Sequence, residues 1–335
     1  MSKVFDVAVV GATGVVGESI LEILDQRNFP IGEIYALASE RSAGNQVDFG
    51  KKKLTVQDLS TFDFSRVQIG LFSAGGSISE EFVPKAAAAG CVVIDNTSHF
   101  RYEDDIPLVV PEVNPDALNK HNNIISNPNC STIQMVLALK SLHDEYKIKR
   151  VIVSTYQAVS GAGKASMDEL VDQTKNYLEG KKINSQNFTK QIAFNLIPHI
   201  DLFDKDGYTK EELKMTNETK KILDNEIEVT ATCVRVPVKT GHSESINIEF
   251  ENLFDFENVI KILKTAPGCK VIDERKDGGY ITPIEAEGEY TTFISRIRKD
   301  NSNIKAINLW VVSDNLLKGA ALNTTQIAEC LMKKM

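Results

Sequence analysis

Residues 4–20 read VFDVAVVGATGVVGESI, and this stretch decides the fold of the first part of the chain. Its apolar run over 4–12 predicts a buried strand, and the apolar spacing from Val16 to Leu24 predicts a helix directly after it. The glycines of GATGVVG lie between the two, where they permit a tight turn and a close approach of the backbone to a pyrophosphate at the helix N-terminus. The G-x-x-G-x-x-G spacing differs from G-x-G-x-x-G, so an ordinary strand–helix turn is the alternative to a dinucleotide site.

Strands and helices continue to alternate up to about residue 130. The pattern predicts strands over 33–39, 67–74 and 91–96, and a helix over 79–90 that ends at Gly90. Such alternation is typical of a parallel sheet with right-handed crossovers. We therefore expect an α/β domain of the Rossmann type in this part of the chain.

The chain beyond residue 130 has longer segments that alternate and are rich in β-branched residues. They predict strands over 150–159, 227–238, 244–250, 289–299 and 305–314. Helices are predicted over 165–177, 211–223, 258–263 and from about 316 to the end, the last capped by Asp314 or Asn315. We expect these strands to form one large, mostly antiparallel sheet in an α+β domain.

Length and composition exclude several classes of protein. A chain of 335 residues is long enough for about two domains. The formal net charge of −8 argues against nucleic acid as the main partner. No apolar run approaches the ~20 residues that span a bilayer, and the N-terminus lacks a signal peptide, so we expect a cytoplasmic protein without membrane contact.

The cysteines indicate neither disulfides nor a metal site. There are five of them, an odd number, and they lie far apart in the sequence. This distribution does not fit a disulfide framework, and no clustered Cys/His spacing suggests zinc.

The end of the second predicted strand bears on the choice of nicotinamide cofactor. A carboxylate there would bind the ribose 2′-OH of NAD, whereas an arginine accommodates the 2′-phosphate of NADP. The chain reads Ser39-Glu40-Arg41-Ser42, and an arginine flanked by two hydroxyls favours NADP. Glu40 could instead turn inward and bind the ribose 2′-OH, so NAD remains the alternative cofactor.

Cys130, in the stretch SNPNCST, lies where a turn leads into an apolar helix that begins near Ser131. The amides at a helix N-terminus favour the thiolate, whose pKa falls from about 8.5 to roughly 3.5–7.5 in such sites. A nucleophile is therefore one interpretation of Cys130, and a small buried core residue is the other. His242, in the polar stretch VRVPVKTGHSES, is predicted to lie in a turn between two strands and is the best placed of the histidines to serve as its acid/base.

Six blocks of sequence, in this order, resemble the aspartate-β-semialdehyde dehydrogenase family between Val7 and Gln326. They are GATGVVG, SNPNCST, TYQAVSGAG, EELKMTNET, RVPVKTGHSES and WVVSDNLLKGAALNT. The resemblance implies the reversible NADPH-dependent reductive dephosphorylation of L-β-aspartyl phosphate to L-aspartate-β-semialdehyde. It also implies a place in lysine, threonine, methionine and diaminopimelate biosynthesis.

The resemblance further implies roles for residues that match the family's motifs. Cys130 would form an acyl thioester, His242 would act as acid/base, and Gln157 would orient the substrate. Groups that would bind the substrate and its phosphate are Arg101, Asn129, Glu211, Lys214 and Arg235. Contacts with NADP would come from Gly11, Thr13, Gly14, Val15, Val16, Gly17, Ser39, Arg41, Ser42, Ser160, Gly161 and Asn315.

Some of these residues also have ordinary structural explanations. Arg235 could form a surface ion pair, Asn315 could cap a helix, and Glu211 and Lys214 have the i,i+3 spacing of a helix-surface pair.

The domain organisation and assembly follow from the same resemblance. We expect an NADP-binding domain over 1–129, completed by a C-terminal helix over 315–335. The catalytic and dimerisation domain would span 130–314, resemble the C-terminal domain of glyceraldehyde-3-phosphate dehydrogenase, and join a second copy in a homodimer.

Three alternative functions remain open. They are an N-acetyl-γ-glutamyl-phosphate reductase, a cysteine acyltransferase or hydrolase without redox chemistry, and a nucleotide-sensing protein without catalysis.

Overall fold

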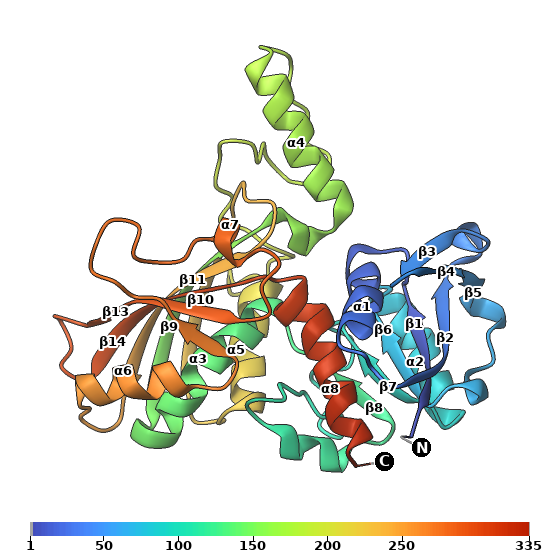
Figure 1. Cartoon of the computed structure of the whole chain (residues 1–335). Coiled ribbons are helices and arrows are strands. Elements are labelled where there is room, and N and C mark those ends of the chain that lie inside the picture. The colour runs from blue at the N-terminus through green and yellow to red at the C-terminus, as the bar shows by residue number, and fades with distance from the viewer. Residues whose placement is uncertain (1–2, 335) are drawn as a thin grey trace. The chain divides into compact units, whose positions relative to one another are not determined.

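The GATGVVG turn joins a buried strand, β1 (Phe5–Val10), to a helix, α1 (Val15–Gln26), in the computed structural model, which describes residues 3–334. Contacts within the chain divide it into two units. The first unit contains the residues up to Asn129 and those from Ala320 onward, and the second unit contains Cys130–Gly319. Figure 1 shows the elements of both units in chain order.

The first unit is built on a sheet of six parallel strands in the order β5-β2-β1-β6-β7-β8. Besides β1, these are β2 (Ile31–Ala38), β5 (Gln57–Asp58), β6 (Ile69–Phe72), β7 (Val92–Asp95) and β8 (Ile124–Ser126). The helices α1, α2 (Gly76–Ala88) and α8 (Leu322–Met332) pack in the same unit, and β3 (Gln46–Phe49) pairs with β4 (Lys52–Thr55) as a hairpin. The predicted parallel sheet of the Rossmann type is confirmed.

The second unit contains a mixed sheet of six strands in the order β10-β9-β11-β14-β13-β12. Its strands are β9 (Ile148–Gln157), β10 (Glu228–Arg235), β11 (His242–Phe250), β12 (Cys269–Val271), β13 (Thr292–Lys299) and β14 (Ala306–Ser313). The central pairs are antiparallel and the two outer pairs, β10 with β9 and β12 with β13, are parallel. The prediction of a large, mostly antiparallel sheet is therefore confirmed.

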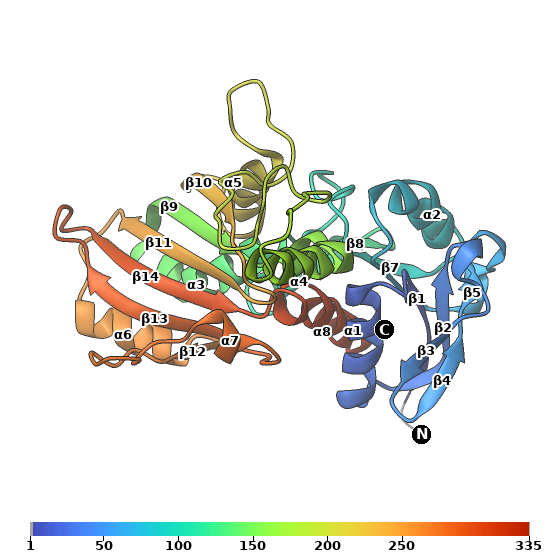
Figure 2. The same cartoon turned by 90° about the horizontal axis from the view of Figure 1, so that it is seen from above.

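Helices cover the two faces of this second sheet unequally. The helices α3 (Cys130–Tyr146), α5 (Lys210–Ile222) and α6 (Phe256–Thr265) lie on one face, where apolar side chains of the strands and helices form the core. The short helix α7 (Pro283–Ala286) lies on the other face, and α4 (Lys164–Leu178) projects away from the sheet (Figures 1 and 2). The helix α3 also contacts the start of β11, where Gln134 donates to the main-chain oxygen of His242 at 3.3 Å.

One local prediction needs correction, and two others become more specific. His242 is the first residue of β11 rather than part of a turn, because its main chain already pairs with Ser313 of β14. The C-terminal helical segment begins with a π-helical turn at Leu317–Ala321, and α8 follows it. Of the two proposed caps, Asp314 accepts the main-chain N–H groups of residues 316 and 317 at 2.8 and 3.2 Å.

Candidate active site

The sheet of the second unit brings several predicted residues to one of its ends. Gln157 and Arg235 are the last residues of the parallel strands β9 and β10 and lie opposite each other in the register. His242 begins β11, which runs antiparallel to β9, so it lies at the same end of the sheet. All three side chains are buried. Strand direction alone therefore gathers residues that are up to 85 positions apart in the sequence.

The His242 ring is held in one orientation by the backbone. Its Nδ1 accepts the N–H of Ala158 at 3.0 Å, so in the neutral ring the proton is on Nε2. Burial, with the positive charge of Arg235 as a second cause, lowers the pKa of His242 from 6.5 to about 3. Within residues 3–334, Nε2 has no hydrogen-bond partner. His242 therefore presents a neutral N–H donor.

Arg235 is fixed close to the same ring. Its Nη1 donates to the carbonyl oxygen of Ala158 at 2.7 Å, so Ala158 binds both Arg235 and His242. A Cβ added to Gly161 would lie 3.1 Å from both Arg235 Nη1 and His242 Nε2. The backbone at Gly161 thus passes directly over the two side chains. Burial lowers the pKa of Arg235, and the negative charge of Glu211 opposes this effect.

Gln157 is oriented by hydrogen bonds at both ends of its side-chain amide. Thr155, two residues earlier on β9, donates to its Oε1 at 3.0 Å, and its Nε2 donates to Glu211 Oε1 at 2.9 Å. The other oxygen of Glu211 accepts from Lys214 Nζ at 3.0 Å, and Lys214 also donates to Asp201 at 2.9 Å. The i,i+3 pair on α5 therefore belongs to a partly buried network that includes Gln157, and it is more than a surface ion pair.

The charges of this network fix the protonation of Lys214. Burial lowers its pKa, but the carboxylates of Glu211 and Asp201 outweigh burial, so the pKa of Lys214 is raised overall. Lys214 is thus an ammonium group shared by two carboxylates, and such a group can also bind a phosphate.

Cys130 is the first residue of α3 and is partly exposed. The position places the thiol at the helix N-terminus, where the backbone amides favour a thiolate. A thiolate at Cys130 raises the pKa of Arg235, so the two groups interact electrostatically. The segment after β14 also approaches closely: a Cβ on Gly319 would lie 2.7 Å from the Cβ of Cys130.

Ser160 and Asn315 are joined in the second unit. Asn315 Nδ2 donates to Ser160 Oγ at 2.9 Å, and Asn315 Oδ1 accepts the N–H of Gly241 at 2.9 Å. These bonds tie the turn before α4 and the segment after β14 to the residue that precedes His242.

The glycine turn of the first unit has the shape required for a dinucleotide. Gly11 has φ of 85°, and a Cβ there would lie 2.9 Å from the backbone of Ser73. A Cβ on Gly17 would lie 2.1 Å from the Gly11 carbonyl oxygen. Gly14 precedes α1 without a side-chain cap, so the amides at this helix start lack such a partner. The turn, with Thr13, Val15 and Val16, can therefore cradle a phosphate group.

The segment Ser39–Ser42 follows β2, the neighbour of β1, and both strands end at the same edge of the parallel sheet. Arg41 is exposed and forms no ion pair among the described residues. It is thus positioned to meet a phosphate beside the glycine turn.

Arg101 and Asn129 belong to the first unit and are both buried. Arg101 follows β7 and donates through Nη2 to the carbonyl oxygen of Asn96 at 2.8 Å. Asn129 directly precedes Cys130 in the sequence.

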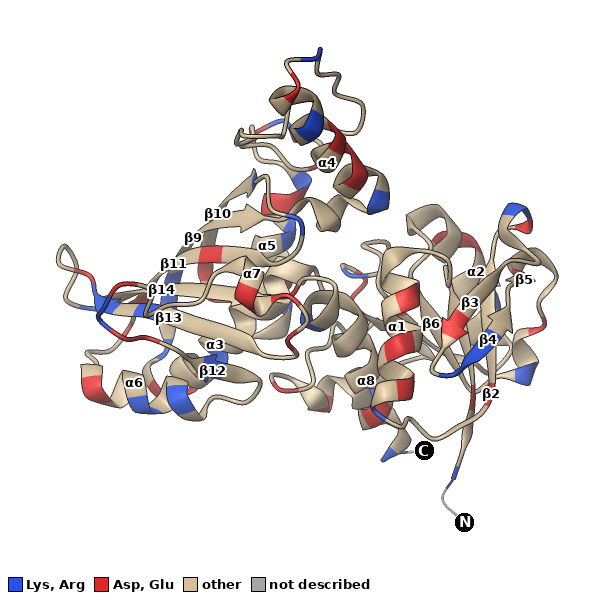
Figure 3. Cartoon of the chain, turned by 45° about the horizontal axis from the view of Figure 1, so that its top comes forward, with Lys and Arg blue, Asp and Glu red and all other residues tan. Residues whose placement is uncertain are grey.

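Charged side chains of both signs are spread over the two units, and several acidic residues lie on α1 (Figure 3).

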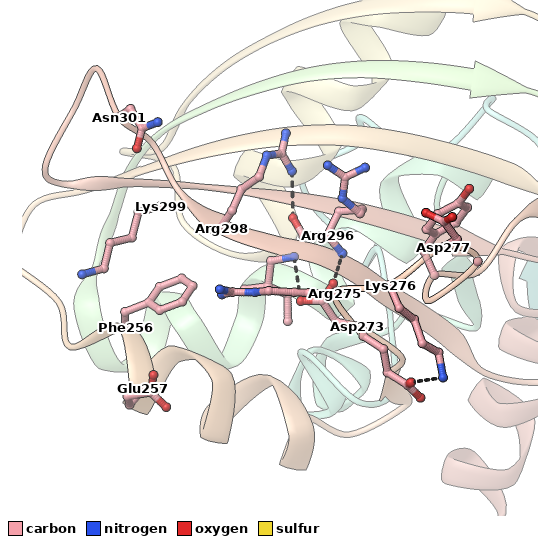
Figure 4. A pocket seen from close by; sticks show the side chains of 14 residues that line it. Phe256, Glu257, Asp273, Arg275, Lys276, Asp277, Arg296, Arg298, Lys299 and Asn301 are labelled. Carbon is pink, nitrogen blue, oxygen red and sulfur yellow. Dashed lines mark hydrogen bonds and ion pairs between the residues drawn. The ribbon is translucent and has the colours of Figure 1, made fainter.

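A groove of about 1000 Å³ in the second unit is lined by charged residues around Asp273 (Figure 4). Asp273 accepts the main-chain N–H groups of Arg296 and Ile297 at 2.6 and 3.1 Å. No predicted site residue is among those that line this groove.

The sequence did not predict several polar residues that contact the site. Thr155, Asp201 and Gln134 bind predicted residues through their side chains. Only strand alternation could have indicated Thr155, which shares a face of β9 with Gln157.

Within residues 3–334, no group of three or more His, Cys, Asp or Glu side chains could hold a metal ion. In the same residues, no helix is long and apolar enough to cross a membrane.

Comparison with known proteins gives concordant results. Two family models match: the semialdehyde dehydrogenase NAD binding domain over residues 6–121, and the semialdehyde dehydrogenase dimerisation domain over residues 139–318. The aspartate-semialdehyde dehydrogenases of Legionella pneumophila and Aquifex aeolicus are 52% and 53% identical to the chain; the alignments cover 100% and 98% of it, and 97% and 98% of the relatives.

Two solved structures are also similar. Aspartate semialdehyde dehydrogenase II of Vibrio cholerae complexed with ASA is 51% identical, with a TM-score of 0.97 over 99% of each chain. The Candida albicans aspartate semialdehyde dehydrogenase with NADP is 26% identical, with a TM-score of 0.78 over 98% of each chain.

Proposed function

The chain belongs to the aspartate-semialdehyde dehydrogenase family, and from this premise we propose that it converts L-β-aspartyl phosphate to L-aspartate-β-semialdehyde with NADPH, reversibly. The observation that carries the proposal is the gathering of Gln157, Arg235 and His242 at one end of the second sheet, with Cys130 acting electrostatically on Arg235. The product is a precursor for lysine, threonine, methionine and diaminopimelate.

Covalent catalysis begins at Cys130. The thiolate attacks the carbonyl carbon of the acyl phosphate, the bond to the phosphate oxygen breaks, and inorganic phosphate leaves behind a thioester. The position of Cys130 at the start of α3 supports this role, because helix amides stabilise both the thiolate and the oxyanion of the tetrahedral intermediate. When bound, NADPH supplies the hydride that reduces the thioester carbonyl. Collapse of the hemithioacetal then releases the aldehyde and regenerates the thiolate of Cys130.

His242 acts through the proton on Nε2. Since Nδ1 is occupied by the Ala158 N–H, the ring donates from Nε2 to the oxygen that gains negative charge in each tetrahedral intermediate. Its place beneath Gly161 and beside Arg235 supports this function. Gln157, held by Thr155 and Glu211, orients the acyl group.

The substrate is anionic at both ends, and basic residues are proposed for each. Arg235 binds the carboxylate, for which a planar guanidinium is suited. Lys214 and Arg101 bind the phosphate, assisted by Asn129, and the carboxylate of Glu211 binds the amino group. The two carboxylates on Lys214 support this assignment, because they keep its ammonium group charged.

The cofactor is proposed to be NADP, held by the first unit. The glycine turn supports a pyrophosphate site because the amides at the start of α1 have no side-chain cap. Gly11 and Gly17 allow this tight turn, since a Cβ on either would collide with backbone. Arg41, with Ser39 and Ser42 beside it, would bind the 2′-phosphate. Ser160, Gly161 and Asn315 are proposed to contact the cofactor from the turns that border His242. We assign residues 1–129, with the C-terminal segment, to cofactor binding, and the second unit to catalysis and dimerisation.

We propose that the enzyme is a homodimer in the cytoplasm. The match to a dimerisation domain over residues 139–318 supports a second copy of the chain as partner. A nucleophilic thiol must stay reduced, and the cytosol supplies reducing conditions.

A single assay tests the activity. With L-aspartate-β-semialdehyde, phosphate and NADP, the wild type should reduce NADP, while Cys130→Ala should lose more than about 1000-fold in kcat but still bind NADP. Absence of turnover in the folded wild type would refute the proposal. Activity only with the N-acetyl-γ-glutamyl semialdehyde would favour the related reductase, and equal activity with NAD would refute the role of Arg41.

A further inference from the structure

A second row of buried residues lies directly behind the catalytic row of the sheet. Glu244 follows His242 by two positions on β11, so both side chains point to the same face. In the register Glu244 lies opposite Thr155 of β9, and Thr155 lies opposite Cys233 of β10. All four side chains have 0% exposure. Glu244 is therefore a buried carboxyl group, two residues further along β11 than His242.

Little in the surroundings of Glu244 stabilises a negative charge. Neither of its oxygens forms a hydrogen bond within the described part of the chain. Burial raises the pKa of Glu244 well above 4.5 and outweighs the polar interaction with the neighbouring Gln134 side chain, which lowers it. An unpaired buried carboxylate is strongly unfavourable, so the group keeps its proton.

Gln134 connects Glu244 to both catalytic elements. It lies one helical turn after Cys130 on α3 and is 1% exposed. Its Nε2 donates to the main-chain oxygen of His242 at 3.3 Å, whereas its Oε1 has no hydrogen-bond partner among residues 3–334. A protonated carboxyl offers the O–H donor that this Oε1 lacks.

We propose that Glu244 is a positioning residue for the reaction. As a neutral acid it donates a hydrogen bond to Gln134, and Gln134 in turn holds the main chain at His242. The first turns of α3 and the start of β11 thereby keep a fixed position relative to each other. The inference rests on the proposed function for its catalytic meaning. Glu244 does not orient the His242 ring directly, because Nδ1 of that ring already accepts the Ala158 N–H.

Glu244→Gln and Glu244→Met separate the role of the donor from that of shape. Gln is neutral and still offers an N–H donor, whereas Met fills a similar volume without one. We expect Glu244→Met to lower kcat by about 10- to 100-fold with little change in KM, because the reacting groups shift while substrate still binds. Glu244→Gln should restore most of that loss. The matched control is Glu249→Gln on the outer face of β11, where Glu249 pairs with Lys149 at 3.4 Å, and it should leave kcat unchanged.

Unfolding experiments test the proton on Glu244 without any substrate. The folded state retains a proton that the unfolded state releases above pH 4.5, so wild-type stability falls relative to Glu244→Gln as the pH rises. The ratio of their unfolding equilibrium constants should grow about tenfold per pH unit above that point. Glu249→Gln should show no such divergence from the wild type.

Two results would overturn the proposal. One is a Glu244→Gln variant as impaired in kcat as Glu244→Met, and the other is a constant stability difference between Glu244→Gln and wild type across that pH range. If Glu244→Met does not fold, the pH-dependent unfolding of Glu244→Gln decides the question. A failure of the proposed function would be distinct, since the wild type would then lack turnover while the unfolding results would be unaffected.

Discussion

Gly319 lies against the proposed nucleophile, and this close approach leads to a prediction at the scale of single residues. A Cβ on Gly319 would lie 2.7 Å from Cβ and 3.2 Å from Cα of Cys130, distances that force one of the two segments to move. Gly319→Ala should therefore lower kcat/KM by up to about 100-fold, because the thiol is displaced from the reacting carbon. Steady-state kinetics would measure this loss.

The control for this variant is Ile304→Ala between β13 and β14, where the side chain is 81% exposed at the end of the sheet opposite His242. It should retain wild-type kinetics. An unchanged kcat/KM in Gly319→Ala would mean that the position of Cys130 does not depend on this contact.

His242 gives a prediction about pH. Its folded pKa of about 3 lies below the ordinary 6.5, so between these values the unfolded state binds a proton that the folded state does not. Stability contributed by the neutral ring is thus present above pH 6.5 and falls by about 1.4 kcal/mol per unit as the pH drops below it. The imidazole resonance of His242, assigned by its absence in His242→Asn, should not shift between about pH 5 and 8. A titration of that resonance centred near 6.5 would contradict a neutral donor in the site.

At the scale of secondary structure, strand ends explain how much of the site could be predicted. Gln157, Arg235 and His242 are in recognisable sequence blocks, and the direction of β9, β10 and β11 brings them together. Gln134 and Asp201 are in no such block. Gln134 and Asp201 both contact residues of other elements. Sequence periodicity shows which face of an element is buried, but it does not show which residues that face contacts.

Short elements were harder to predict than long ones. The sequence missed the hairpin β3–β4 and the short strands β5, β8 and β12, because two to four residues give too few alternations to distinguish a strand from a loop. It placed His242 in a turn because the polar residues around it resemble a loop, whereas pairing with β14 makes it a strand residue.

The helix α4 yields a prediction at this scale. Glu169, which is buried, accepts the main-chain N–H groups of Gln186 and Asn187 at 3.1 and 2.6 Å, and thereby fixes the segment after the helix. Glu169→Ala should raise amide hydrogen exchange at these two residues by roughly 10- to 100-fold, since bonds to a charged group are lost. Hydrogen exchange with mass spectrometry measures the change. Asp172→Ala, at an exposed position on the same helix, is the control and should match the wild type; equal exchange in Glu169→Ala would show that the segment is held by other contacts.

At the scale of the whole molecule, the first unit is assembled from two stretches that are distant in the sequence. The C-terminal helix α8 packs in that unit, where Asn323 donates to Asn127 Oδ1 at 2.7 Å and Glu329 accepts from Arg27 at 2.6 and 2.8 Å. The sequence predicts such a return only through the family resemblance, because an amphipathic helix does not specify which apolar surface it covers. The unit that carries the glycine turn therefore depends on residues at the other end of the chain.

Ending the chain after Gly319 tests this dependence. The shortened protein should lose NADP binding, since the first unit is left without α8, whereas the second unit keeps all of its own residues. Trp310, the single tryptophan, reports on the second unit, where its Nε1 donates to the Ile281 carbonyl oxygen at 3.1 Å. The emission of Trp310 should stay native-like, while the change in NADPH fluorescence on binding should disappear.

The control is the full-length Glu329→Gln variant. It weakens only a partly exposed ion pair worth at most about 1 kcal/mol, so it should still bind NADPH. Cofactor binding by the shortened chain would show that the glycine turn and its sheet fold without α8, and a denatured Trp310 spectrum would show that the two units do not fold independently.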